Sequence, residues 1–389
     1  MSAAITSIGV VTGFGLGLEA TVASVLAGRT AIGPVTRFST RGLSSSLASE
    51  APDDAQLATA VARSCAGGWC NRASRLLLAA LADALGDRLL MPTNRRGVVV
   101  GTTKGALEHM ASSDSGASVS SQDSLGNPAR ALALATQARG PVYTTGAACA
   151  SSAVALGEAL TLVEDGVCDE VFVGGTEALH AFIYEGFHAL RALSATPAAP
   201  FDAERNGLSL GEGAAVLLIE SLAHARSQGR RPLALVEGFG AAVDGFDQTA
   251  PDPAGSGLLA ACHRALERAG VTAREIDRYH AHGTATLQND RMEAVVHASL
   301  FGERLVPVCA IKGALGHTLG AAAALDIAVC AQTLAQQVLP PVANLRRLDP
   351  SALVPAVVGL ARASPGSLAL IANAGFGGIN TAVVLRRPV

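Results

Sequence analysis

The sequence predicts an α/β fold, in which a mostly parallel or mixed β-sheet is covered by helices on both faces. Segments with the composition of buried strands alternate with segments of helical spacing along most of the chain. One strand segment, residues 214–219, is continuously apolar, which is typical of a strand buried on both faces. With 389 residues, of which 49% are hydrophobic and 16% charged, the chain is compatible with two fused compact halves.

In the first half, the β-branched and apolar patterns predict strands and the 3.6-residue patterns predict helices. A stretch rich in Ser, Ala and Asp (40–70) and another rich in Ser, Gly and Asp (101–126) predict irregular structure. The elements expected in chain order are a strand at 3–11, a helix at 19–27, a helix at 74–90, a strand at 97–100, a helix at 129–138, a strand at 142–144, a helix after Cys149, and strands at 170–174, 214–219 and 233–242.

The second half repeats this order of elements without a repeat of residues. We therefore expect two similar halves, at residues 1–242 and 243–389. The elements expected in the second half are a helix at 256–269, a short strand ending at 279–282, a helix at 289–301, a strand at 306–311, a long helix at 319–339, and strands at 368–372 and 382–385.

Composition argues against several classes of function. A net charge of -3 and few aromatic residues give no basic or stacking surface for nucleic acid, and none for an anionic membrane. We expect a cytoplasmic protein because the N-terminus lacks a secretory signal. The most apolar window, 319–339, carries Asp326 and three glutamines and predicts a buried helix. The seven cysteines are scattered, and Cys65 and Cys70 lack the spacing of a zinc or redox pair.

A turn of small residues surrounds Cys149 (146–152, GAACASS) and opens a helix. A thiol at a helix N-terminus faces unpaired N–H groups and the positive end of the helix dipole, which favours the thiolate. Read alone, the turn slightly favours an ordinary buried cysteine over a reactive one. The choice between the two depends on residues further along the chain.

Three turns of the second half follow predicted strands, where α/β proteins commonly place their sites. The first (282–286, HGTAT) has His282 beside a glycine and two hydroxyls, the second (312–320, KGALGHTLG) contains Lys312 and His317, and the third (373–378, NAGFGG) surrounds Phe376 with small residues. The second turn lacks the residue order of a nucleotide-binding loop. The chain contains only two lysines, Lys104 and Lys312, which suggests that the ammonium itself matters at these positions.

Taken together, the four turns resemble the β-ketoacyl-acyl-carrier-protein synthases of the thiolase superfamily, of the elongating type with a Cys-His-His site. The resemblance covers nearly the whole chain. Further segments that carry it are 8–12 (IGVVT), 26–34 (LAGRTAIGP), 174–177 (GGTE), 191–194 (RALS), 200–202 (PFD), 210–214 (LGEGA) and 375–378 (GFGG).

The resemblance implies the thiolase fold, a duplicated five-layer αβαβα sandwich, and a dimer. By motif position it implies the following roles: Cys149 as nucleophile, His282 and His317 as the paired histidines, Lys312 as the site lysine, Glu293 as a structural acid, Thr284 and Thr286 as phosphopantetheine-binding residues, Phe376 as an aromatic gate and Phe187 as an acyl-pocket residue.

The chemistry that the resemblance implies is a decarboxylative Claisen condensation. An acyl group on Cys149 reacts with malonyl-carrier, and the backbone N–H groups of Cys149 and Phe376 form the oxyanion hole. Two neutral histidines stabilise the enolate, so neither a metal nor a redox cofactor is expected. The expected partners are an acyl carrier protein and either a twin or a related ketosynthase or chain-length-factor subunit.

Two departures from the family bear on the substrate. The segment 105–125 is short, and Ala374 stands where the family usually has an aromatic residue. Both changes affect the expected acyl tunnel, and compact ketosynthases of type II polyketide or aryl-polyene pathways are a fair comparison.

Three alternatives to an elongating synthase fit the sequence less well. A chain-length-factor-like partner subunit commonly lacks the cysteine, which is present here. A thiolase needs a second cysteine near the C-terminus, and none follows Cys330. A cysteine hydrolase needs an Asn or Asp partner for its histidine, and the sequence offers no obvious one.

Overall fold

The computed structural model describes residues 3–61, 71–106 and 124–388. Within them, one sheet of eleven strands has the order β12-β11-β15-β16-β10-β1-β9-β7-β5-β6, with β2 (Gly15–Leu16) paired to β1 outside this path. The ten main strands are β1 (Ala3–Thr12), β5 (Arg96–Gly101), β6 (Val142–Thr145), β7 (Glu170–Glu177), β9 (Gly213–Ser221), β10 (Ala234–Val243), β11 (Arg278–His280), β12 (Val308–Cys309), β15 (Leu368–Gly375) and β16 (Ile379–Arg386).

The sheet consists of two sets of five strands with the same order and the same directions. In the first set, β5 lies parallel to β6 and β7, and β9 lies antiparallel to β7 and β1. In the second set, β11 lies parallel to β12 and β15, and β16 lies antiparallel to β15 and β10. The sets join where β1 and β10 pair antiparallel. The repeated order of elements that the sequence predicts is confirmed as a repeat of topology.

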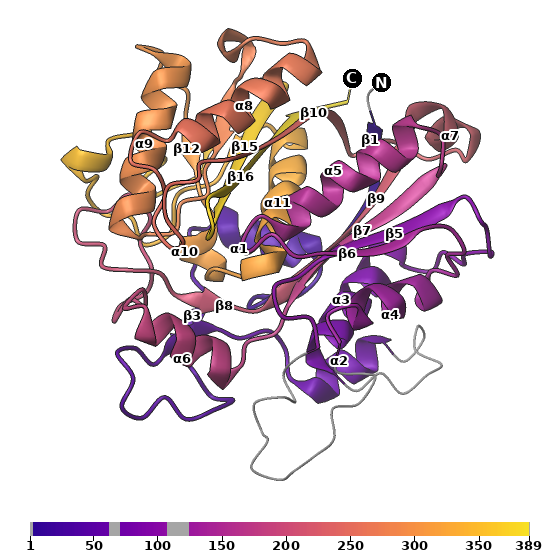
Figure 1. Ribbon diagram of the computed structural model, residues 1–389, viewed down its shortest axis with the longest axis horizontal. Coiled ribbons are helices and arrows are strands. Elements are labelled where there is room, and N and C mark those ends of the chain that lie inside the picture. The colour runs from indigo at the N-terminus through magenta and orange to yellow at the C-terminus, as the bar shows by residue number, and fades with distance from the viewer. Residues whose placement is uncertain (1–2, 62–70, 107–123, 389) are drawn as a thin grey trace.

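Helices form three layers around the two sets of strands (Figure 1). Two helices, α5 (Ser151–Glu164) and α11 (Ala322–Ala335), lie side by side in the middle and contact strands of both sets. Two others, α3 (Arg72–Leu85) and α4 (Asn127–Ala135), cover the outer face of the first set. The outer face of the second set is covered by α8 (Ser256–Ala269), with α9 (Leu287–Phe301) packed beside it. This is the five-layer αβαβα sandwich of the thiolase fold.

The sequence of the central helices explains why they occupy the middle layer. Helix α11 is apolar on every side, and each residue from 322 to 331 is buried. In α5, Gly157 lies against the ring of Phe239 on β10, where an added Cβ would lie 2.4 Å from the ring. The apolar window of the second half is therefore a buried helix, as the sequence predicts. In the described parts of the chain, no helix is long and apolar enough to cross a membrane.

Shorter elements surround the sandwich. The helices are α1 (Leu18–Leu26), α2 (Asp54–Val61), α6 (Ala181–Ala189), α7 (Leu222–Ser227), α10 (Lys312–Leu315) and the 3₁₀ turns Ala273–Glu275, Leu319–Ala321 and Pro350–Ala352, and the strands are β3 (Ile32–Pro34), β4 (Leu47–Ser49), β8 (Leu210–Gly211), β13 (Val338–Leu339) and β14 (Arg362–Ala363).

The prediction of irregular structure over 40–70 is confirmed for residues 40–46 and 50–53 and wrong for residues 47–49 and 54–61. Residues 47–49 form β4, which pairs with β3 and β8. Helix α2 follows, and its N-terminus is capped reciprocally: the Gln56 N–H donates to the Asp53 carboxylate (2.8 Å), and the Asp53 N–H donates to the Gln56 side chain (3.2 Å). Residues 62–70, with Cys65 and Cys70, lie outside the described residues, as does most of the predicted loop (107–123).

Among the other predicted elements, the following three extend too far along the chain. The helix expected at 319–339 ends at Ala335 because Gln337 takes a left-handed conformation (φ 56°) and leads into β13. The helix expected at 74–90 ends at Leu85, before Gly86 (φ 55°). The strand expected at 306–311 is only β12, since α10 begins at Lys312. Helices α6 and α7 were not predicted.

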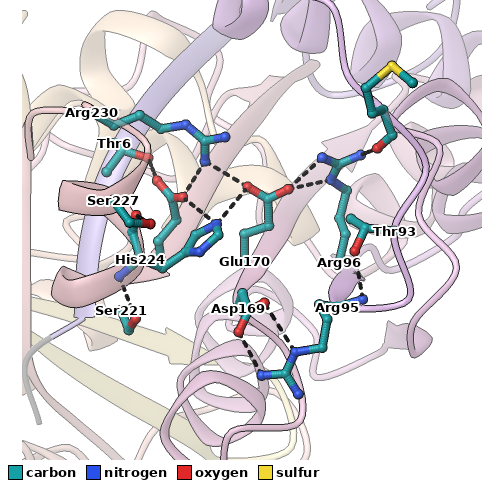
Figure 2. Close-up of polar contacts among 12 residues, drawn as sticks. Thr6, Thr93, Arg95, Arg96, Asp169, Glu170, Ser221, His224, Ser227 and Arg230 are labelled. Atoms are coloured by element: carbon teal, nitrogen blue, oxygen red, sulfur yellow. Dashed lines mark hydrogen bonds and ion pairs between the residues drawn. The ribbon is translucent and has the colours of Figure 1, made fainter.

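A buried ion-pair cluster joins the beginning of β7 to the end of β9, at the edge opposite the carboxyl ends of the parallel strands β5, β6 and β7. The Arg230 guanidinium contacts the carboxylates of both Glu170 and Glu220. In Figure 2, Arg230 and Arg96 contact Glu170 from opposite sides. His224 points toward both carboxylates. Because each carboxylate has a guanidinium partner, this cluster serves to hold strands together.

Candidate active site

The residues singled out in the sequence converge at one edge of the sheet. Cys149 follows β6, His282 follows β11, Phe376 follows β15, and His317 follows β12 through α10. Since the carboxyl ends of parallel strands within a set meet at the same edge, residues far apart in the chain are brought to one cavity. Cys149, His282, His317 and Phe376 all line this cavity.

The turn at Cys149 is held by its own helix. Ala148 takes a left-handed conformation (φ 47°), which turns the chain sharply before α5 begins at Ser151. The Ser151 hydroxyl accepts from the Ala147 N–H (2.9 Å) and donates to the Ala148 carbonyl (2.6 Å). The cysteine is therefore fixed at the start of the central helix, and it is only 6% exposed.

Burial, and not the helix N-terminus, decides the protonation of this cysteine. It raises the pKa of the Cys149 thiol to about 11, although the positive charge of Lys312 and hydrogen bonds to the sulfur from the backbone N–H groups of Phe376 and Cys149 act in the opposite direction. The expectation that the helix N-terminus favours a thiolate is therefore wrong for the resting site. The two N–H groups that reach the sulfur are the pair expected as oxyanion-hole donors.

His317 makes the direct side-chain contact with Cys149. Its Nε2 lies 3.0 Å from the Cys149 Sγ. The His317 backbone is fixed beside β8: its N–H donates to the Ser209 carbonyl (2.7 Å), and its carbonyl accepts from the Gly211 N–H (3.0 Å). Burial, together with the Lys312 charge, lowers the pKa of His317 to about 3, so this imidazole is neutral at pH 7.

His282 stands opposite, with its ring centroid 5.2 Å from that of His317. Its loop is fixed by Glu293 on α9, whose carboxylate accepts from the N–H groups of His282 (2.7 Å) and Gly283 (2.6 Å) and from the Asn289 side chain (2.8 Å). Burial and the Lys312 charge lower the pKa of His282 well below its usual value. Both imidazoles of the site are therefore neutral near pH 7.

Lys312 affects the two histidines through its positive charge. Its Nζ lies 2.9 Å from the Asp326 carboxylate on α11, which also accepts from the Asn373 side chain (2.8 Å) and lies 3.2 Å from His280 Nε2. Burial raises the pKa of Asp326, but Lys312 and His280 outweigh it and bring it to about 2. The ammonium is thus held by a carboxylate that stays ionised at pH 7.

Two cavities meet at the Cys149 sulfur. The outer cavity contains both histidines and, further out, the hydroxyls of Thr284 and Thr286, which lie 2.9 Å apart. The second cavity, which we name the inner cavity, is lined by residues of α6 and is mostly apolar, and two of its lining residues, Phe182 and Leu190, are 61% and 51% exposed. Phe376 lines both cavities, as does Phe187 of α6, and their rings stack with centroids 5.8 Å apart. Ala374, at the end of β15, opens onto the outer cavity.

Two groups of side chains among the described residues have the donor types and spacing of metal ligands. In the first, Cys149 Sγ and one nitrogen of each of His282 and His317 lie within 4.8 Å of one another. The second group consists of Glu170, Glu220 and His224. Its two carboxylates already contact guanidinium groups: Arg96 and Arg230 donate to Glu170 (Figure 2), and Arg230 donates to Glu220. Only the first group keeps its donor atoms turned toward a cavity.

Three residues at the site were not singled out as functional from the sequence. Asp326 was noted only as a polar residue in an apolar window, and that isolated charge was the signal for a buried partner. His280 precedes the predicted His282 turn, and no feature of the sequence marks it separately as a functional residue. Glu177 was noted only as part of a motif. Its carboxylate accepts from the Gly320 N–H (3.0 Å) and so anchors the segment after His317.

Comparisons with known proteins agree with this arrangement. Family models described as the N-terminal and C-terminal domains of β-ketoacyl synthase match residues 2–225 and 233–346. The chain is 32% identical to the oxytetracycline polyketide putative beta-ketoacyl synthase 1 of Streptomyces rimosus, over 99% of this chain and 96% of that protein. It is also 32% identical to the 3-oxoacyl-[acyl-carrier-protein] synthase 2 of Rhizobium meliloti, over 98% of each.

Among solved structures, the ishigamide ketosynthase/chain length factor superimposes with a TM-score of 0.93 at 29% identity, over 100% of this chain and 99% of that one. The two family models together span more than half of the chain, and both curated relatives align over almost their whole length. The chain belongs to the β-ketoacyl synthase family.

Proposed function

We propose that this protein is a β-ketoacyl-acyl-carrier-protein synthase. It catalyses the decarboxylative Claisen condensation of an acyl group, held on Cys149, with malonyl-carrier in chain elongation of the fatty-acid or polyketide type. The observation that carries the proposal is the convergence of one thiol and two neutral imidazoles in a single cavity, with two backbone N–H groups directed at the sulfur.

The first half-reaction loads Cys149. The thiol is protonated at rest, and His317 Nε2, 3.0 Å away, is placed to accept its proton as the sulfur attacks the carrier thioester. The carbonyl oxygen becomes negative and is held by the N–H groups of Cys149 and Phe376, each of which contributes about 3 kcal/mol in comparable sites. The C–S bond to the carrier then breaks, and the departing carrier sulfur takes the proton from His317.

The second half-reaction uses both histidines. Malonyl-carrier enters the outer cavity, where Thr284 and Thr286 hydrogen-bond its phosphopantetheine arm. Loss of CO₂ leaves the bonding electrons on the thioester as an enolate, whose oxygen receives hydrogen bonds from the neutral rings of His282 and His317. The enolate carbon attacks the acyl carbon on Cys149, and the Cys149 sulfur leaves as a thiolate, which takes a proton from water to restore the resting thiol. The product is a β-ketoacyl-carrier that is two carbons longer.

Three other residues support this chemistry. Lys312 keeps the imidazoles neutral, because its charge disfavours a second positive charge nearby. Glu293 orients the His282 loop through its two backbone hydrogen bonds. Phe376 and Phe187 stand between the two cavities and separate the acyl chain from the incoming extender.

The proposal includes an acyl carrier protein as partner and no metal or redox cofactor, since the substrates arrive on phosphopantetheine. It places the reaction in the cytoplasm. A dimer is supported by β6, the last strand of the sheet, which exposes Val142 (41%) and Tyr143 (47%) and leaves one edge unpaired among the described residues. The partner is either a second copy or a related subunit of the chain-length-factor type.

Mass spectrometry of the protein incubated with acyl-carrier tests the proposal. We expect one acyl mass on the peptide that contains Cys149 and none in the Cys149→Ala variant. Addition of malonyl-carrier should then remove that mass and release CO₂ and a β-ketoacyl-carrier. Acylation of a different cysteine, or an acyl-Cys149 that malonyl-carrier does not discharge, would show that the assignment is wrong.

A further inference from the structure

The inner cavity beyond Cys149 combines an apolar wall with one cation. Its apolar part consists of Phe182, Ile183, Phe187, Leu190, Leu319 and Phe376. Among the described residues that line it, Lys104 is the only one with a formal charge. Lys104 is also the one lysine of the chain that the condensation mechanism leaves without a role.

The backbone that carries Lys104 is fixed by a buried carboxylate. Glu177, at the end of β7, accepts from the N–H of Lys104 (3.2 Å), from the N–H of Thr103 (2.9 Å) and from the Thr103 hydroxyl (2.7 Å). The same carboxylate holds Gly320, beside Leu319 of the cavity wall. The position of Lys104 is therefore set by the same group that fixes part of the cavity wall.

The Lys104 ammonium makes no hydrogen bond or ion pair with another residue that the structure describes. Glu177 is already engaged by five backbone and hydroxyl donors. Placing a wholly saturated chain against an ammonium removes water from the charge and gives nothing in return, which is unfavourable. An oxygen on the chain restores a hydrogen bond to the charge, and such charge-assisted bonds are stronger than neutral ones.

We infer that Lys104 is a specificity-determining residue, which selects acyl chains bearing an oxygen acceptor over saturated hydrocarbon chains of the same length. The inference rests on the proposed function, because the chain in the inner cavity is the one loaded on Cys149. The acceptor is a keto oxygen or a carboxylate on the part of the chain that lies beyond the thioester. Lys104 donates to it without taking part in the transfer itself.

The test compares loading rates for matched eight-carbon chains on one carrier protein: octanoyl, 5-oxo-octanoyl, 7-oxo-octanoyl and the chain that ends in a carboxylate. Mass spectrometry follows the acyl mass on Cys149 with time. We expect the wild-type protein to load at least one oxygenated chain faster than octanoyl. In Lys104→Met the ratio of the two loading rates should fall about tenfold to a hundredfold, because this is the change that the free energy of a hydrogen bond to a charged group usually produces.

Lys104→Arg is the matched control, since it keeps a positive donor, and we expect it to keep the preference within a few-fold. Thermal melting checks that both variants are folded. The inference is overturned if the wild-type protein shows no preference for any oxygenated chain, or if Lys104→Met leaves every ratio unchanged. In those cases Cys149 is still loaded and the proposed function stands. Failure of every chain to load Cys149 overturns both.

If Lys104→Met loses the preference only for the chain that ends in a carboxylate, the acceptor is an anionic chain end. If it loses the preference for the oxo chains, the acceptor is a keto group, at the position along the chain whose loading rate relative to octanoyl changes most. Either result supports the inference and reports which oxygen Lys104 meets.

Discussion

The clearest test of the site is the pH dependence of Cys149 acylation after removal of His317. With a thiol pKa of about 11, about one Cys149 in ten thousand is ionised at pH 7 in the absence of a base. In the wild-type protein, His317 lies 3.0 Å from the sulfur and stays neutral down to about pH 3, so it can accept the thiol proton throughout the usual range. Wild-type acylation should therefore change little between pH 6.5 and 9.

In His317→Ala, only the rare thiolate reacts. Its concentration rises about tenfold with each pH unit, so acylation should increase by about a hundredfold between pH 6.5 and 8.5. Water that fills the space of the ring will lower the Cys149 pKa toward its ordinary value, and the increase should then level off near pH 9. Quenched-flow mass spectrometry of the Cys149 peptide measures both pH profiles. In His317→Ala we expect acylation of Cys149 to persist in part and malonyl decarboxylation to be lost.

His282→Ala is the matched control, because its ring lines the same cavity without a hydrogen bond to the sulfur. This variant should lose malonyl decarboxylation but keep the flat pH profile of acylation. A flat profile in His317→Ala, or a steep one in His282→Ala, would refute the assignment of His317 as the base. Survival of condensation in His317→Ala would refute the two-histidine mechanism altogether.

Four further predictions concern stability and metal dependence. Lys312→Met leaves the buried Asp326 carboxylate without its ammonium and should cost about 3–5 kcal/mol in urea unfolding. Lys312→Met combined with Asp326→Asn should recover part of that loss, and a double variant no more stable than Lys312→Met would contradict the pairing. Because folding lowers the Asp326 pKa to about 2, its contribution to stability is complete above about pH 4 and is lost as the pH falls toward 2. Asp326→Asn should remove this part of the acid dependence. Gly157→Ala should destabilise the fold by about 1–3 kcal/mol, because the new methyl group would lie 2.4 Å from the Phe239 ring, and an unchanged urea midpoint would disprove the close packing. Prolonged dialysis against EDTA should leave condensation unchanged, since the mechanism uses neutral imidazoles, and a loss that zinc restores would contradict it.

Local signals in the sequence were sufficient to predict the reactive turns and several elements. Helix α8 has the expected bounds, 256–269, because glycines in left-handed conformation stand at both of its ends. The turns with Cys149, His282 and His317 combine small residues with reactive ones directly after strands, and the structure brings all three residues together. These features depend on short stretches of chain, which a sequence displays directly.

Features that depend on pairing between distant residues were not predicted. The ion pair of Lys312 with Asp326 joins two segments whose contact only the fold creates, and the Asp326 charge in an apolar window was its one trace. The Cys149 pKa was expected in the wrong direction, because the local helix terminus was visible in the sequence and the burial was not. Helix α6 was missed, and with it the element that presents Phe187 to the inner cavity.

The duplicated topology has a consequence for how this chemistry is encoded. Cys149 comes between the third strand of the first set and its central helix, and His317 comes between the third strand of the second set and the matching helix. Cys149 and His317 therefore occupy corresponding places in the two sets of strands. Neither set alone contains both residues, so the proposed chemistry needs the two sets packed together.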